Sequence, residues 1–170
     1  DPAEVLGAAL RKLGYSLNSR DERELRAAQA EAVRQKPLLR AYLNTEVRDQ
    51  AVAGDILCAQ IWSTTGQQAI DASKDLEFVY PEEGFPLSLD CAVILRESPR
   101  KALAQEFLNY LLEPAVSARI AETMRTATAN GAARPLLTAA TRGNATLYPP
   151  PEVIARAEWF ATVTSEAQRL

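Results

Sequence analysis

Histidine is absent from this sequence, and its 170 residues contain only two cysteines and one methionine. Without histidine, Ser-His and Cys-His activation of a nucleophile and most zinc chemistry are excluded. No cofactor and no metal-ligand set is therefore predicted. Cys58 and Cys91 lie inside apolar runs, so we expect both to be buried packing residues, with their redox state left open.

A basic surface is lacking as well. Lys and Arg number 19 against 22 Asp and Glu, a net charge of −3, which argues against a nucleic acid or an anionic membrane surface as partner. No stretch approaches the roughly 20 apolar residues of a membrane span, and no basic-then-apolar signal region opens the chain. Because the chain begins "DPAEV" without an initiating Met, we expect a mature or excised piece of a longer protein.

Helices are the clearest local pattern. A hydrophobic content of 47% is enough for one globular domain with a core. Asp1 and Pro2 are expected to begin the first helix, Ser19 to open a capping box with Glu22, and Ser98 to cap a leucine-rich helix. Apolar residues at helical spacing predict helices over about 1–13, 19–37, 45–52, 98–112, 116–124 and 153–160, with another starting at residue 63.

Four apolar runs predict strands between these helices. They are 38–43, 56–62, 76–80 and 89–95, and the run at 56–62 is nearly continuous, which is typical of a strand covered on both faces. Strands that alternate with helices predict an α/β fold with a mixed or mostly parallel sheet flanked by helices, and a helix-rich C-terminal half. Such folds bind ligands beyond the carboxyl ends of their strands.

Trp62 stands at that end of the predicted strand 56–62, directly before the helix that Ser63 begins. We therefore expect the indole to face a binding crevice, the alternative being a core Trp covered by a helix. Asp90 opens the apolar run 89–95, where a carboxylate is costly unless it is paired or lies at a strand mouth. The alternative for Asp90 is a turn residue bonded to nearby amides.

A set of sequence blocks carries a resemblance to one family. They are "LGYSLNSRDERELRAA", "IWSTTGQQA", "PEEGFPLSLDCAV", "ALAQEFLNYLLEPAVSARIAETM", "ANGAARPLL", "TLYPPPEVI" and "AEWF". In order and spacing the chain resembles the C-terminal half of the spermidine/putrescine-binding periplasmic receptors of ABC importers, over essentially its whole length. The resemblance implies one lobe of a periplasmic-binding-protein-like fold, an exported protein in the periplasm or outside the cell, and membrane permease subunits as partners.

In that family two lobes close on a polyamine, with carboxylates at its ammonium groups and aromatic faces along its methylenes. An ammonium over an indole is attracted by the ring quadrupole, and carboxylates make charge-assisted hydrogen bonds to it. The positions that match the family's ligand residues, together with two serines beside them, are Trp62, Asp90, Asp1, Glu4, Ser88 and Ser63. Ser88 stands where the family has an aromatic, Thr126 where it has a tyrosine and Phe160 where it has a glutamine.

The resemblance also implies a first lobe that has no counterpart in this chain. Residues 1–86 and 127–170 resemble the second lobe, and 87–126 resembles the segment that returns to the first lobe. We expect the apolar faces of 87–126 to pack differently, or against a second copy, because unpaired strand edges and leucine-rich faces associate readily.

Several alternatives stay open. The amides of Ser63–Gly66 are a possible anion site at a helix N-terminus, although Asp1, Glu4 and Asp90 would repel an anion in the same crevice. A metal or thiamine-like solute is another option on the same fold. Glu82, Glu83 and Asp90 could form a carboxylate cluster for acid-base catalysis, but an enzyme is not expected since no catalytic motif accompanies them. The leucine-rich helix would also suit an interaction domain without a small ligand.

Overall fold

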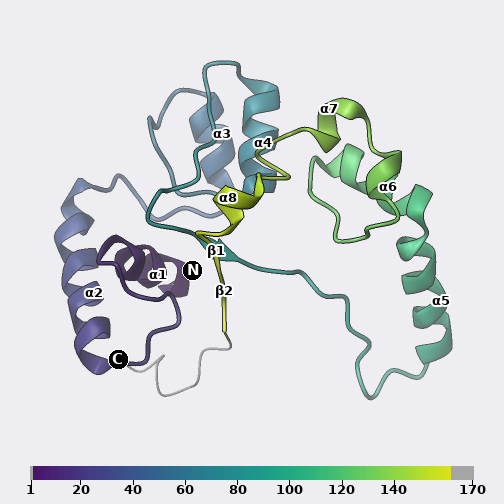
Figure 1. Cartoon of the computed structure of the whole chain (residues 1–170), viewed down its shortest axis with the longest axis horizontal. Helices are drawn as coiled ribbons and strands as arrows, with labels where there is room; N and C mark the ends of the chain where they lie inside the picture. The colour runs from purple at the N-terminus through teal and green to yellow at the C-terminus, as the bar shows by residue number, and fades with distance from the viewer. Residues whose placement is uncertain (1, 162–170) are drawn as a thin grey trace. The chain divides into compact units, whose positions relative to one another are not determined.

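The computed structural model describes residues 2–161, which form two compact units. Unit 1 contains the chain up to Tyr42, Tyr80–Leu89 and the chain from Pro151 onward. Unit 2 contains Leu43–Val79 and Asp90–Pro150. Their helices and strands are labelled in Figure 1. The predicted boundary at 87–126 is a different division of the chain and stays a prediction.

Unit 1 is built on two helices packed against each other, α1 (Pro2–Lys12) and α2 (Glu22–Gln35). Ala9 and Leu10 of α1 meet Ala28 of α2 in a small apolar core. A short 3-10 helix, η1 (Lys36–Leu38), follows α2, and α8 (Pro151–Ile154) comes near the end of the chain. Both long helices confirm the periodicity read from the sequence.

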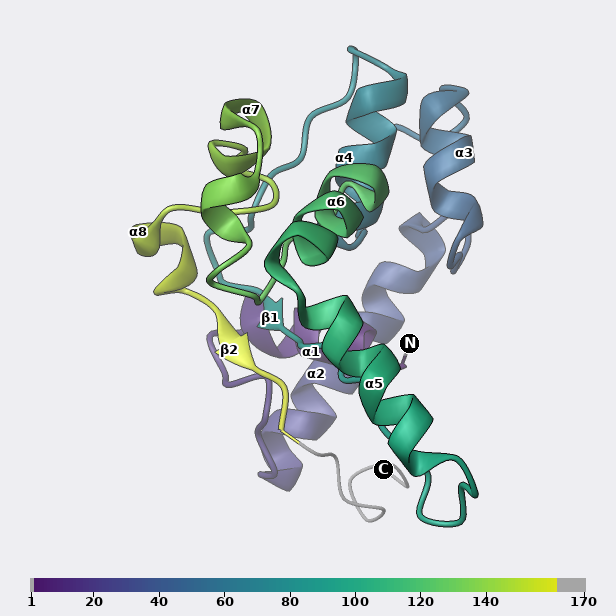
Figure 2. The same cartoon turned by 90° about the vertical axis from the view of Figure 1, so that its right-hand side faces the viewer.

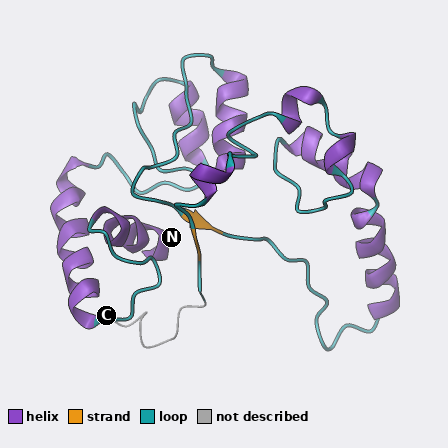
Figure 3. Ribbon diagram, viewed as in Figure 1, coloured by secondary structure: helices purple, strands orange, loops and turns teal. Residues whose placement is uncertain are grey.

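Two short strands complete unit 1, and they are the only strands within residues 2–161. β1 (Pro86–Leu87) and β2 (Glu158–Trp159) pair in parallel, with Pro86 opposite Glu158 (Figure 3). The predicted helix over 153–160 is therefore wrong beyond Ile154. The backbone N–H of Glu158 donates to the Phe85 carbonyl just before β1 at 3.1 Å, and that of Phe160 donates to the Leu87 carbonyl of β1 at 3.2 Å, instead of continuing a helix.

The side chain of Glu158 fixes β2 to the turn after α1. Its carboxylate accepts hydrogen bonds from Arg11, from the Ser16 hydroxyl at 2.6 Å and from the Leu17 amide at 3.1 Å. Asn18 extends this link by donating from its side-chain amide to the Trp159 carbonyl at 2.8 Å. These long-range bonds join the start and the end of the described chain within one unit.

Unit 2 is helical. Its elements are α3 (Glu46–Val52), α4 (Ser63–Ala72), α5 (Lys101–Leu112), α6 (Pro114–Met124), η2 (Arg134–Leu136) and α7 (Ala139–Arg142). The predicted break at Glu113–Pro114 is confirmed, since α5 ends there and α6 starts in a new direction (Figure 2). The core of the unit gathers Ala118 and Ala121 of α6 with Ala133 and Leu137.

Two of the predicted helix caps lie elsewhere. Asp21, not Ser19, caps α2, because its carboxylate accepts from the Arg23 amide at 2.7 Å, whereas Ser19 donates to Glu24. The N-cap of α5 is Arg100, and the Ser98 hydroxyl accepts only a 3.4 Å bond from the Arg100 amide. In α2 the Asp21 carboxylate takes the place of the predicted serine at the free amides of the first turn, whereas α5 has no side-chain cap at Arg100.

The predicted strands at 38–43, 56–62, 76–80 and 89–95 do not form within residues 2–161. These segments are drawn as loops in Figure 3, apart from the 3-10 turn that includes Leu38. A strand requires a neighbouring strand for its backbone hydrogen bonds, and the described chain supplies only the β1–β2 pair. The apolar composition of these segments thus favoured an extended backbone, but it did not supply a neighbouring strand for them to pair with.

Burial differs from the expectation for the same reason. Leu57 in the run 56–62 is fully exposed, so that run is not covered on both faces. Cys58 and Cys91 are both exposed and are not joined in a disulfide bond, which corrects the prediction that they are buried. No residue of α5 is buried, and Phe107 is 58% exposed. Packing of this apolar face against a second copy stays a prediction.

Candidate ligand site

Trp62 lies where an extended segment of unit 2 ends and α4 begins. It is the N-cap residue of α4, with backbone angles of −69° and 148°, and its side chain is 51% exposed. The alternative of a core Trp covered by a helix is therefore wrong. The indole is accessible at a helix start, although the strand that was expected to lead to it is absent.

The other predicted ligand residues are placed as follows. Ser63 is the first residue of α4, so it adjoins Trp62. Asp90 is exposed in a loop of unit 2, and the strand whose mouth it was expected to mark does not form. In unit 1, Glu4 is half-buried in α1 and Ser88 is exposed after β1. Asp1 lies outside the described residues.

Only Trp62 and Ser63 are thus brought together by the described geometry. Their grouping with Asp90, Ser88, Glu4 and Asp1 stays a prediction. Asp90 was singled out because a carboxylate inside an apolar strand is costly to desolvate. That reason no longer applies, because a carboxylate in an exposed loop keeps its water and needs no partner.

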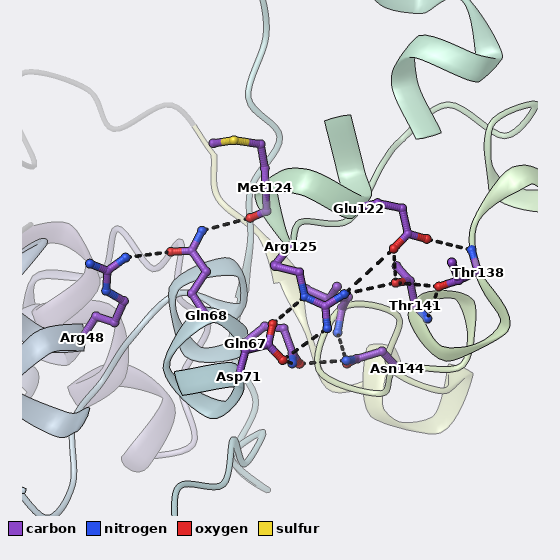
Figure 4. Close-up of polar contacts among 11 residues, drawn as sticks. Arg48, Gln67, Gln68, Asp71, Glu122, Met124, Arg125, Thr138, Thr141 and Asn144 are labelled. Atoms are coloured by element: carbon purple, nitrogen blue, oxygen red, sulfur yellow. Dashed lines mark hydrogen bonds and ion pairs between the residues drawn. The ribbon is translucent and has the colours of Figure 1, made fainter. Parts of the chain in front are cut away.

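A feature that the sequence reading missed is a polar face on α4 (Figure 4). Four of its side chains, at spacings of three, one and three residues, bond to the end of α6 and the loops after it. The Thr64 and Thr126 hydroxyls lie 2.8 Å apart, and the Gln68 amide donates to the Met124 carbonyl at 2.9 Å. The clamp face, as we call it, is Thr64, Gln67, Gln68 and Asp71. This spacing places the four on one side of a helix.

Arg125 is the centre of this contact. Its guanidinium donates two hydrogen bonds to the Asp71 carboxylate and one to the Thr141 hydroxyl at 3.3 Å. Glu122 lies 4.0 Å away, and its carboxylate accepts from Thr141 and from the Thr138 amide. Gln67 joins the same cluster by accepting from the Asn144 side chain at 2.8 Å. Ion pairing and neutral hydrogen bonds together hold α4 to the C-terminal end of α6.

The hydrogen bonds and charges in this cluster shift the pKa values of its ionisable side chains. The hydrogen bond from Arg125 lowers the pKa of Asp71 below its ordinary value, and the same bond raises the pKa of Arg125. The pKa of Glu122 is lowered first by the hydrogen bond from Thr141, with Thr138 adding to it. In unit 1 the pKa of Glu31 is lowered by hydrogen bonds from Lys12 and Arg34. These carboxylates are therefore ionised in the folded protein at neutral pH.

Acid should weaken the folded state through these groups. A carboxyl whose pKa is lowered by folding adds stability above its unfolded pKa of about 4, and that stability is lost as pH falls through the folded pKa. We expect the free energy of unfolding, measured by urea denaturation at several pH values, to fall below about pH 4. In Asp71→Asn this decline should be smaller, since the asparagine cannot titrate.

The matched control for that measurement is Glu22→Gln, which removes an exposed carboxylate paired with Arg26 on α2. Its acid decline should equal that of the parent chain, because pairs of this kind contribute little. If Asp71→Asn follows the parent curve as closely as this control does, the Asp71–Arg125 pair does not stabilise the fold.

The structure gives little support to the alternatives of an acid-base catalytic site or a metal site. Glu82 and Glu83 are exposed in the turn before β1, where the Glu83 carbonyl accepts a 2.7 Å bond from Arg11. In residues 2–161 no group of three or more metal-ligating side chains is arranged to hold an ion. Across the same residues, no helix combines the length and the apolar character needed to cross a membrane.

Comparison with known proteins identifies the family of this chain. Residues 3–145 match the bacterial extracellular solute-binding proteins. The chain belongs to this family. It is 35% identical over 159 residues to the spermidine/putrescine-binding periplasmic protein of Escherichia coli. That match takes in 94% of the chain and 46% of the relative, so the chain spans about half the length of the curated relatives it matches.

Solved structures of solute-binding proteins share the fold. A putative spermidine/putrescine ABC transporter protein of Listeria monocytogenes has a TM-score of 0.90 at 26% identity, covering 98% of the chain and 52% of that protein. A spermidine/putrescine substrate-binding protein of Streptococcus pneumoniae has a TM-score of 0.86, also at 26% identity, covering 99% and 52%. The predicted fold class, one lobe of a periplasmic-binding-protein-like fold with a parallel sheet, is confirmed, although the sheet is small.

Proposed function

We propose that this solute-binding chain forms part of the receptor of an ABC importer, and that Trp62 makes its aromatic contact with an amine-bearing solute. The observation that supports the proposal most directly is the half-exposed indole at the start of α4. An exposed indole attracts an organic cation through its quadrupole, by about 0.5–2 kcal/mol depending on desolvation. The relatives are named for such cations, spermidine and putrescine.

The remaining ligand contacts follow from charge. An ammonium group requires ionised or neutral oxygens to replace its water, which Asp90, Glu4 and Asp1 would supply as carboxylates and Ser63 and Ser88 as hydroxyls. Each of the described members, Glu4, Ser63, Ser88 and Asp90, is at least partly exposed, as a contact with solute requires. The net charge of −3 favours a cation over an anion at long range.

Two of the positions that depart from the family have other partners in the structure. The Thr126 hydroxyl bonds to Thr64, and Phe160 lies beside Gly7 of α1, within 3.7 Å of where a Cβ there would stand. With Ser88 as well, the chain offers fewer aromatic walls than the family pattern. We propose a small cationic solute, with putrescine and spermidine as the first compounds to test.

The partners follow from the same proposal. The family is extracellular and the curated relatives are periplasmic, so a periplasmic or extracellular location is supported. We propose that the receptor closes two lobes on its solute and presents the closed form to permease subunits in the membrane. The relatives are solute-binding proteins, and we propose no enzymatic activity.

Binding should depend on the indole. In calorimetric titration, we expect saturable binding of putrescine or spermidine, and Trp62→Ala should weaken it by roughly tenfold, the upper part of the cation–π range. Trp62→Phe should retain part of the affinity, because a phenyl ring has a weaker quadrupole. Trp159→Ala removes the second exposed tryptophan, in unit 1, and should leave affinity unchanged.

A panel of other solutes tests the competing interpretation. The first turn of α4 carries no acid, and the Gly66 amide is already bonded to Trp62, which leaves the amides of Ser63–Thr65 as an anion site. Sulfate, phosphate and thiamine are therefore titrated beside the amines. Binding of an anion without any binding of amines would overturn the proposal, as would equal amine affinity in Trp62→Ala and the parent chain.

A further inference from the structure

We propose that the clamp face of α4, locked by Arg125, is a positioning device that fixes Trp62, so that Arg125 and Asp71 control solute affinity through the indole. Arg125 and Asp71 are positioning residues in this proposal. The affinity part of the inference rests on the proposed function. The part that concerns the orientation of Trp62 does not depend on any ligand.

The first argument is the spread of the contacts along α4. Thr64, Gln67, Gln68 and Asp71 cover two helical turns, and each has a partner near the end of α6 or in the loops beyond it. A helix held at one residue can still roll or slide. Four contacts along one face remove both motions, and Thr64 is only two residues from Trp62.

The second argument comes from the opposite side of the helix. Gly66 is buried, and a Cβ built there would lie 2.4 Å from the ring of Phe78, so the helix backbone touches that ring directly. α4 is therefore held between Phe78 and the clamp face. A shift of the helix away from either side would move the backbone of Trp62 with it.

The third argument is the backbone at Arg125. Arg125 has φ of 54° and ψ of 48°, and it is the only non-glycine residue in 2–161 with a positive φ. This left-handed position at a helix end is usually glycine, because a side chain is disfavoured there. An arginine at this position is best explained by its guanidinium, which makes two parallel bonds to Asp71 and one to Thr141. The bonds of the Arg125 guanidinium therefore outweigh the cost of its left-handed backbone.

The orientation of Trp62 can be measured directly. Trp159→Phe makes Trp62 the only indole in the 170-residue chain. In that background, Arg125→Gln and Asp71→Asn should lower the fluorescence anisotropy of Trp62 and shift its emission without any ligand. Arg125→Lys keeps the charge but not the paired bonds, and should recover part of the change. All measurements are made at a temperature where circular dichroism shows every variant folded.

Affinity gives the second readout. Arg125→Gln should weaken putrescine binding by about tenfold, which equals ~1.4 kcal/mol, with a smaller loss in Asp71→Asn. The matched control is Arg26→Gln, which removes another arginine–carboxylate pair, on α2 in unit 1, and should change neither readout.

Each outcome decides the inference. If Arg125→Gln and Asp71→Asn lower the melting temperature but leave anisotropy and affinity at parent values, the cluster is merely structural and the inference is wrong. If Arg125→Gln does not fold, Asp71→Asn decides alone. If the parent binds no amine, the proposed function fails, while the anisotropy comparison still decides whether the clamp orients Trp62.

Discussion

Gly84→Ala is expected to destabilise unit 1 by about 3 kcal/mol, which corresponds to a melting temperature lower by roughly 6–12 °C for a chain of this size. Gly84 is buried in the turn before β1 and has φ of 106°, which L residues rarely adopt. A Cβ there would lie 2.3 Å from the Arg156 carbonyl oxygen and 2.6 Å from the Arg11 guanidinium. Backbone strain and steric overlap therefore act together.

Neither clash is easily relieved. The Arg156 oxygen belongs to the backbone, and Arg11 is held by Glu158 and by the Glu83 and Tyr15 carbonyls. Moving Arg11 would therefore disturb the contact that fixes β2. The measurement is thermal and urea denaturation followed by circular dichroism.

Two other glycines separate the causes. Gly14, also in unit 1, has φ of 79° with open space around it, so Gly14→Ala measures the backbone cost alone. Gly131 has neither a positive φ nor a neighbour within 4 Å, and Gly131→Ala should be close to neutral. Equal losses in Gly84→Ala and Gly14→Ala would show that the packing against Arg156 and Arg11 contributes nothing.

Gly66→Ala is expected to cost about 1–2 kcal/mol of stability and to disturb Trp62 as well. Alanine normally favours a helix over glycine by up to about 1 kcal/mol, but the added Cβ would lie 2.4 Å and 2.9 Å from two ring atoms of Phe78. The ring is rigid, so either Phe78 or α4 must move. Denaturation gives the stability, and Trp62 anisotropy in the Trp159→Phe background reports the helix.

Gly7 provides the matched control, since it is also a buried glycine inside a helix. A Cβ at Gly7 would meet the flexible end of Leu17 at 3.3 Å, so Gly7→Ala should be nearly neutral. Combining Gly66→Ala with Phe78→Ala should cost less than the sum of the two single changes, because the shortened side chain removes the clash. Additive losses would contradict the contact between Gly66 and Phe78.

The helices could be predicted because their signals are local. Apolar residues at helical spacing predicted α1 and α6, and the breaks at Gly14 and Pro114 were in place. The strands could not be predicted in the same way. "LDCAVIL" has the composition of a buried strand, but a strand forms only where another supplies its hydrogen bonds, and within the described chain that pairing occurs between Pro86–Leu87 and Glu158–Trp159.

The candidate site was predictable in one part. Trp62 at a helix start was a reasonable prediction from "IWSTTG", and its exposure agrees. The helical spacing of Thr64, Gln67, Gln68 and Asp71 was also present in the sequence and could have indicated a polar contact face. Nothing local indicated that Arg125, 54 residues beyond Asp71, would pair with it.

The sequence by itself therefore determined most of the helices, the lack of histidine chemistry and the family resemblance, because each depends on residue identity or short-range spacing. The tertiary structure alone decided which extended segments paired, which apolar residues stayed exposed and which side chains held α4. Those outcomes depend on what a segment meets in space. A long-range hydrogen bond or a buried contact needs two segments of chain. A single stretch of sequence contains only one of those two segments.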